Sequence, residues 1–105
     1  MGTGSRKVIW APSAHADLDE ALARRRDAAN LLEEILDAAA SLSTLSERGR
    51  LVPEIDDAVT REIFARDFRL MYEVSRDHVH IVALMTGEVV PRAHIVMRFR
   101  ERGRR

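Results

Sequence analysis

The sequence has no cysteine in its 105 residues, which excludes a disulfide framework and thiolate chemistry. It also lacks a stretch long and apolar enough to form a membrane-spanning helix, and the polar residues Met1 to Lys7 do not have the form of a signal peptide. No Ser-His-Asp order, Gly-rich phosphate loop or CxxC motif is present. A chain of this length can bury one modest core. We therefore predict one cytoplasmic domain over residues 1–105, without a cofactor.

Charge is unevenly distributed along the chain, although the formal net charge is zero. Residues 92–105 contain six arginines and a single glutamate, which leaves 11 basic and 16 acidic residues in positions 1–91. A body with a net charge of −5 is a poor nonspecific binder of polyanions. The basic tail is either a solvated terminus or a contact to a phosphate backbone or an acidic protein.

The clearest structural pattern lies between Thr60 and Met85, where three β-prone runs are separated by short turns. We predict antiparallel strands at 61–66, 69–75 and 78–85, with turns at Asp67-Phe68 and Arg76-Asp77. Two-residue turns fix the register of both hairpins. The predicted partners are 65 with 70, 63 with 72, 74 with 79, 72 with 81, and 70 with 83.

This register gives the predicted sheet two different faces. The first is a core face made of Ile63, Ala65, Leu70, Tyr72, Val74, Val79, Ile81 and Ala83. The second is apolar in its middle and ionisable at its ends, and comprises Glu62, Phe64, Arg66, Arg69, Met71, Glu73, His78, His80, Val82 and Leu84. A purely solvated face would carry fewer apolar residues. We therefore expect the second face to bind either the chain's own C-terminal stretch or a partner.

A first strand and two helices are predicted ahead of this sheet. Lys7 to Trp10 is a β-prone run that adds a strand. Ser13 is a natural N-cap for a helix whose last turn holds Arg24 to Arg26, and Asp27 caps a second helix that runs towards Gly49. The apolar stripe of that second helix comprises Ala28, Leu31, Ile35, Ala38, Leu42 and Leu45, widened by Leu32, Leu36 and Ala39. The predicted fold is α/β of the α+β type, with an antiparallel helical hairpin packed on one face of a mainly antiparallel sheet.

Four segments carry a family resemblance. They are Val8-Ile-Trp10 with Pro12 and Asp17-Leu18, then Gly49-Arg-Leu-Val-Pro-Glu54, Arg61-Glu62-Ile63, and Phe68-Arg-Leu-Met-Tyr-Glu-Val74. In this order they resemble the RelE/ParE superfamily of type II toxin-antitoxin toxins, over residues 7–86. The resemblance implies a small toxin of the plasmid-stabilisation type that inhibits growth and is held inactive by a cognate antitoxin. RelE-like members cut messenger RNA on the ribosome, whereas ParE-like members poison DNA gyrase.

The resemblance also implies residues for the nuclease alternative. Arg69 matches the arginine that begins the family's central strand, and it falls on the non-core face, where RelE-like enzymes assemble their active site. It would there bind the scissile phosphate, with Arg61, Arg92 and His94 as the other catalytic candidates. The alternative role of Arg69 is to bond to loop carbonyls or to Glu88.

The nuclease set departs from the family pattern, because no tyrosine follows Tyr72 and Glu62 faces the expected site. The acidic body agrees with this departure, since such nucleases must dock on ribosomal RNA. We therefore favour a gyrase-directed, non-catalytic role over RNA cleavage. A binding module without toxicity is a second alternative.

Six residues are predicted to contact the antitoxin or the target: Arg66, Met71, Glu73, His80, Arg98 and Arg100. Glu62, Glu73 and His80 are expected to form a row across the second face, but no further ligand accompanies them and no metal is predicted. In the C-terminal segment, residues 87–105, Pro91 should redirect the chain after the sheet. We expect the apolar run Ile95 to Phe99 to pack on the sheet and the basic end to contact the target.

Overall fold

The computed structural model of the chain describes residues 5–55, 59–86 and 95–98. Its centre is a five-stranded sheet in the order β1-β5-β4-β3-β2. The strands are β1 (Lys7–Trp10), β2 (Arg50–Leu51), β3 (Thr60–Ala65), β4 (Phe68–Val74) and β5 (His78–Thr86). β1 pairs with β5 in parallel, and the other neighbouring strands are antiparallel. The predicted first strand is thus confirmed, and β2 is a short edge strand that sequence analysis did not predict.

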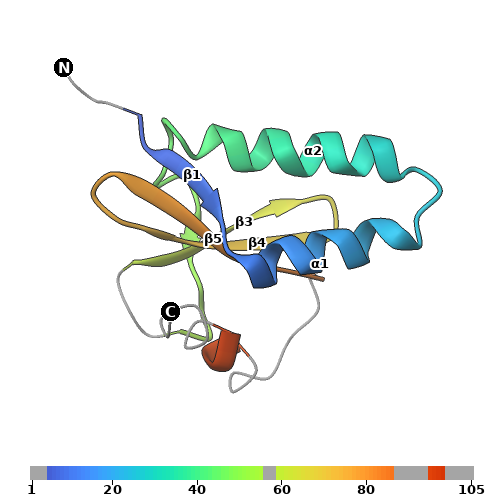
Figure 1. The fold of residues 1–105 in the computed structure, drawn as a ribbon. Coiled ribbons are helices and arrows are strands. Elements are labelled where there is room, and N and C mark those ends of the chain that lie inside the picture. The colour runs from blue at the N-terminus through green and yellow to red at the C-terminus, as the bar shows by residue number, and fades with distance from the viewer. Residues whose placement is uncertain (1–4, 56–58, 87–94, 99–105) are drawn as a thin grey trace.

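Two helices, α1 (Pro12–Ala23) and α2 (Ala28–Ser41), lie side by side along one face of the sheet (Figure 1). Their apolar residues pack on the sheet because they recur at helical spacing. The buried core between helices and sheet includes Ala14, Leu18, Leu31, Ile35, Ala39, Leu42, Ile63, Leu70, Tyr72, Val79 and Ile81. This arrangement confirms the predicted α+β fold with a helical hairpin on one face of the sheet.

The ends of α1 differ from the prediction. Ala11 occupies the N-cap position and Pro12 begins the helix, a position that suits proline because the first helical residues have no intrahelical use for an N–H group. Ser13 is therefore inside the helix, and its hydroxyl donates to the Val82 carbonyl at 3.4 Å. The helix ends at Ala23, before the three arginines that were expected in its last turn.

The second helix is shorter than predicted, because it ends at Ser41 and does not approach Gly49. Leu36 and Leu45, which were assigned to its buried stripe, are 43% and 58% exposed. Asp27 stands at the N-cap position but makes no side-chain cap bond. Its carboxylate instead accepts a hydrogen bond from Arg66 at 2.5 Å.

The β3–β4 hairpin turns one residue earlier than predicted. Ala65 pairs with Phe68, so the turn residues are Arg66 and Asp67, and Arg66 adopts a left-handed conformation with φ of 55°. The predicted pairing of 63 with 72 is therefore wrong, since Ile63 pairs with Leu70. The error is a slip of two positions along β4, which leaves every residue on its predicted face.

The β4–β5 hairpin confirms two predicted pairs and contradicts the third. Residues 74 and 79 are partners, as are 72 and 81, but 70 pairs with Leu84 in place of Ala83. The register shifts between Met71 and Tyr72, where β5 contains one extra residue, a β-bulge. Beyond the bulge the faces of β5 are exchanged, so Leu84 joins the helix-side core and Ala83 lies on the other face. A period-two pattern cannot reveal such an extra residue.

The second face of the sheet carries a smaller apolar cluster. Val52, Met71, Ala83, Met85 and Ile95 are buried against one another there. Ile95 belongs to a short helical turn at 95–98, on the side of the sheet opposite α1 and α2 (Figure 1). The chain's own C-terminal stretch therefore covers part of this face, which is one of the two occupants that the sequence predicted. Phe64, on the same face, remains 50% exposed.

A buried tyrosine ties the segment after α2 to the sheet. The Tyr72 hydroxyl donates to the Ser46 carbonyl at 2.8 Å and accepts from the Gly49 N–H at 3.0 Å. Burial raises the pKa of Tyr72, which keeps the phenol protonated and able to donate. These two hydrogen bonds hold Gly49 against β3 just before β2 begins.

Candidate functional site

Arg69, the central nuclease candidate, is buried in a network of ion pairs. Its Nε donates to Glu62 at 2.7 Å, and its two terminal nitrogens donate to the two carboxylate oxygens of Glu54 at 3.1 and 2.8 Å. The side chain of Arg69 is 4% exposed and that of Glu62 is 0% exposed. Arg50, which is largely exposed, reaches the other oxygen of Glu62 at 2.6 Å. The charge of Arg69 is therefore compensated by two carboxylates and turned away from solvent.

The network also shifts the pKa values of Glu54 and Arg69. Hydrogen bonds from Arg69 hold the pKa of Glu54 below its ordinary value of 4.5, even though burial acts in the opposite direction. The pKa of Arg69 is raised, first by Glu54 and also by Glu62. A fork-shaped, two-bond contact of this kind is among the stronger ion-pair geometries in proteins. Glu54 and Glu62 are the partners that sequence analysis did not identify for Arg69, although both lie in segments of the family resemblance.

We expect the stability of the fold to fall in acid through Glu54. A carboxyl group whose pKa is lowered by folding stabilises the folded state above its unfolded value, and this contribution disappears as the pH falls from about 4.5 through the folded pKa. Urea unfolding measured between pH 7 and pH 3 should therefore show a smaller loss of unfolding free energy for Glu54→Gln than for the wild type. An equal loss in both proteins would contradict the assigned role of Glu54.

Arg61 does not join Arg69. It pairs with Tyr72 in the β3–β4 register, whereas Arg69 pairs with Phe64, so the two arginines point to opposite faces of the sheet. One terminal nitrogen of Arg61 donates to the Gly49 carbonyl at 2.6 Å. Arg92 and His94, the remaining catalytic candidates, lie outside the described residues. The structure thus describes two of the four catalytic candidates, and these two lie on opposite faces of the sheet.

The predicted binding residues are dispersed over the molecule. Met71 is fully buried in the apolar cluster of the second face, which also contains Ile95, and Arg98 is bound to Asp17 at 2.6 Å. Arg66 is at the far turn of the β3–β4 hairpin, where it pairs with Glu34 and Asp27 and lowers the pKa of both. Arg100 lies outside the described residues.

The expected row of Glu62, Glu73 and His80 is only partly formed. Glu73 is opposite His80, as predicted, but Thr60 and not Glu62 is its neighbour in β3. The slip of the β3–β4 hairpin moves Glu62 opposite Met71, where its carboxylate accepts a hydrogen bond from Arg69. In the described part of the chain, no group of three or more metal-ligating side chains is assembled.

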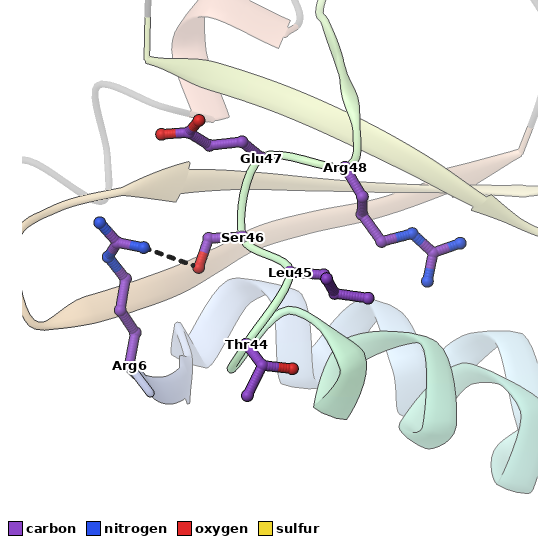
Figure 2. Close-up of a pocket in the computed structure, with 6 residues that line it drawn as sticks. All are labelled: Arg6, Thr44, Leu45, Ser46, Glu47 and Arg48. Atoms are coloured by element: carbon purple, nitrogen blue, oxygen red, sulfur yellow. Dashed lines mark hydrogen bonds between the residues drawn. The ribbon is translucent and has the colours of Figure 1, made fainter. Parts of the chain in front are cut away.

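A different polar site surrounds the segment that follows α2. One hollow of about 400 Å³ is lined by Arg6 and by residues 44–48. In Figure 2 the guanidinium of Arg6 reaches the hydroxyl of Ser46, at 3.1 Å, whereas the side chain of Arg48 extends to the other side of the segment. Arg6 also donates to the Ser75 carbonyl at 2.8 Å, which joins the residues before β1 to the β4–β5 turn.

A second hollow, of about 280 Å³, shares Arg6 and Glu47 with the first. We call it the arginine hollow, and its lining residues are Arg6, Glu47, Val59, Arg61, Val74, Ser75 and Arg76. Its three arginines come from the residues before β1, from β3 and from the β4–β5 turn. Because they are far apart in the sequence, no local motif signals their convergence.

Among the described residues, no helix has the length and apolar character needed to cross a membrane.

The chain is similar to a known toxin family and to a solved structure. The family model of the ParE toxin of type II toxin-antitoxin system, parDE, matches residues 8–90. A solved structure from P. aeruginosa, named "Chromosomal ParDE TA system from P. aeruginosa", is similar with a TM-score of 0.64 and 18% sequence identity, over 82% of this chain and 100% of that chain. At that identity the likeness shows a common fold. No curated protein matches the chain.

Proposed function

Because the chain belongs to the ParE toxin family of type II toxin-antitoxin systems, we propose that it inhibits growth by poisoning DNA gyrase in the cytoplasm. We further propose that a cognate antitoxin binds and neutralises it. In this role the chain acts by binding and does not itself break a covalent bond.

The observation that supports the choice of target is that the N–H donors of Arg69 are already bound within the protein. An arginine that stabilises a cleaved phosphate must present free N–H donors to it, but the donors of Arg69 are directed to Glu54 and Glu62. Releasing Arg69 for catalysis would leave Glu62, whose side chain is fully buried, without its buried cation and paired only with the exposed Arg50. Such a rearrangement costs several kcal/mol. This supports a binding role over RNA cleavage.

The charge distribution supports the same choice. A ribosome-dependent nuclease docks on ribosomal RNA and gains affinity from many phosphate contacts. The first 91 residues carry a net charge of −5, which opposes such docking. A toxin that acts on an enzyme can use contacts of mixed polarity.

The expected result of a reconstituted assay is that the purified chain, gyrase, ATP and supercoiled plasmid together accumulate linear DNA with protein bound to its ends. The same chain, incubated with translating ribosomes, should leave the message intact. In cells, a short induction should cause DNA breaks and filamentation while translation continues. Cut messages and an early stop in translation would reject the gyrase assignment in favour of a RelE-like nuclease.

Neutralisation is tested by expressing the chain with and without the product of its neighbouring gene. Growth should stop when the soluble chain is produced alone and should resume when both are produced. Normal growth with the chain alone, at confirmed soluble expression, would support a non-toxic binding module instead. The variant Arg26→Gln, which changes an exposed residue between α1 and α2, is a suitable control for expression level.

A further inference from the structure

The arginine hollow carries positive charge that no carboxylate in the described part of the chain neutralises through an ion pair. Of the arginines in the described segments, Arg25, Arg50, Arg66, Arg69 and Arg98 form ion pairs with carboxylates. Arg6, Arg61 and Arg76 form none within those segments. Glu47 also lines the hollow but is not ion-paired to any of the three. The hollow therefore gathers three cations and one acid on a body that is acidic overall.

Two of these arginines are held in place by neutral groups. Arg6 donates to the Ser75 carbonyl and the Ser46 hydroxyl, and Arg61 donates to the Gly49 carbonyl. Each guanidinium has five N–H donors, so both keep donors for a ligand after these bonds are made. Carbonyl partners fix a guanidinium without cancelling its charge. The side chains are thus positioned before a ligand arrives, which reduces the entropy lost on binding.

The third arginine is free to close over a ligand. Arg76 is exposed in the β4–β5 turn and makes no hydrogen bond or ion pair to another described residue. The walls of the hollow also include Val59, which is 48% exposed, and Val74. The hollow therefore offers cations beside apolar surface, a combination that suits an acidic side chain on a peptide with apolar neighbours.

A nucleic-acid strand fits this surface less well. Its phosphates follow one another every few ångström, so they would extend past the hollow onto the neighbouring acids. Glu47 lines the hollow and Asp77 follows Arg76 directly. A carboxylate on a protein partner brings an isolated charge that can enter the hollow alone.

We infer that the arginine hollow binds an acidic segment of the antitoxin, with one or two carboxylates between Arg6, Arg61 and Arg76. This inference rests on the proposed neutralisation and adds to it the chemistry of one contact. Charge attraction of this kind mainly accelerates association and selects the partner.

The test uses the full chain and the purified product of the neighbouring antitoxin gene. Arg76 can be changed without loss of a contact within the fold, so we expect Arg76→Gln to remain folded. Its affinity for the antitoxin should fall about threefold to tenfold, and that of Arg76→Glu about tenfold or more, mainly through slower association. These differences should shrink at about 0.5 M salt, where charges are strongly screened.

Arg26→Gln is the matched control, because Arg26 is also an exposed arginine without a carboxylate partner in the described chain but lies between the two helices. It should bind the antitoxin as the wild type does. Replacing the antitoxin's acidic residues one at a time by their amides should identify one whose effect disappears in the Arg76→Gln background. That coupling would assign the carboxylate that enters the hollow.

The possible failures are distinguishable. If the wild type does not bind the antitoxin, both the proposed neutralisation and this contact are rejected. If it binds and the Arg76 variants bind equally well, the contact alone is rejected. If the wild type instead binds a 20-base-pair duplex DNA, and Arg76→Glu weakens only that binding, the hollow is a nucleic-acid contact and the inference is overturned.

Discussion

Replacing Arg69 with alanine is expected to lower the free energy of unfolding by about 3–5 kcal/mol. The substitution removes the cation between Glu62 and Glu54 and leaves the fully buried carboxylate of Glu62 with Arg50 alone. An unpaired buried carboxylate is costly because the protein interior solvates charge poorly. Urea unfolding followed by circular dichroism at neutral pH measures the loss.

Two variants separate the loss of charge pairing from the loss of the side chain. Arg50→Ala removes the other cation on Glu62, but that arginine is 60% exposed, so its effect should be below about 1 kcal/mol. Adding Glu62→Gln to Arg69→Ala should recover part of the lost stability, because the buried charge is then gone. If Arg69→Ala is as stable as the wild type, the ion pairs do not form in solution and Arg69 is again available as a nuclease candidate.

Replacing Gly49 with alanine is expected to cost a comparable amount, about 3–5 kcal/mol. An added methyl group would lie 2.5 Å from both the Glu62 carbonyl oxygen and the Tyr72 hydroxyl. Neither neighbour can retreat easily, since one is strand backbone and the other belongs to a fully buried ring. Relief of the clash would break the Gly49–Tyr72 hydrogen bond and displace the start of β2. Thermal and urea unfolding of the purified variant measure this effect.

The Tyr72→Phe variant provides the comparison. By itself it should cost about 1–3 kcal/mol, because the Ser46 carbonyl and the Gly49 N–H lose their buried partner. The double variant with Gly49→Ala should lose less unfolding free energy than the sum of the two single losses, since phenylalanine removes one of the two clashing atoms. Full additivity would show that the alanine methyl group does not meet the tyrosine hydroxyl.

Local patterns determined the fold class. Alternation in residues 60–85 was sufficient to separate a core face from a second face, and helical spacing was sufficient to place α1 and α2 over the core face. The predicted faces of β3 and β4 were correct although the turn between them was misplaced, because a slip of two residues preserves the side on which each residue lies. The resemblance of four short segments identified the toxin family, which the match over residues 8–90 confirms.

Tertiary structure alone decided which face Ala83 and Leu84 occupy and which partners the charged residues have. The β-bulge in β5 exchanged Ala83 and Leu84 between the two faces, because one inserted residue changes a side without changing composition. Arg69 became a buried network residue because Glu54 and Glu62, which lie on two other segments of the chain, converge on it. Arg6, Arg61 and Arg76 form one hollow for the same reason. Sequence spacing predicts faces within a strand or helix, but the distance between charges on separate elements is set only when those elements pack.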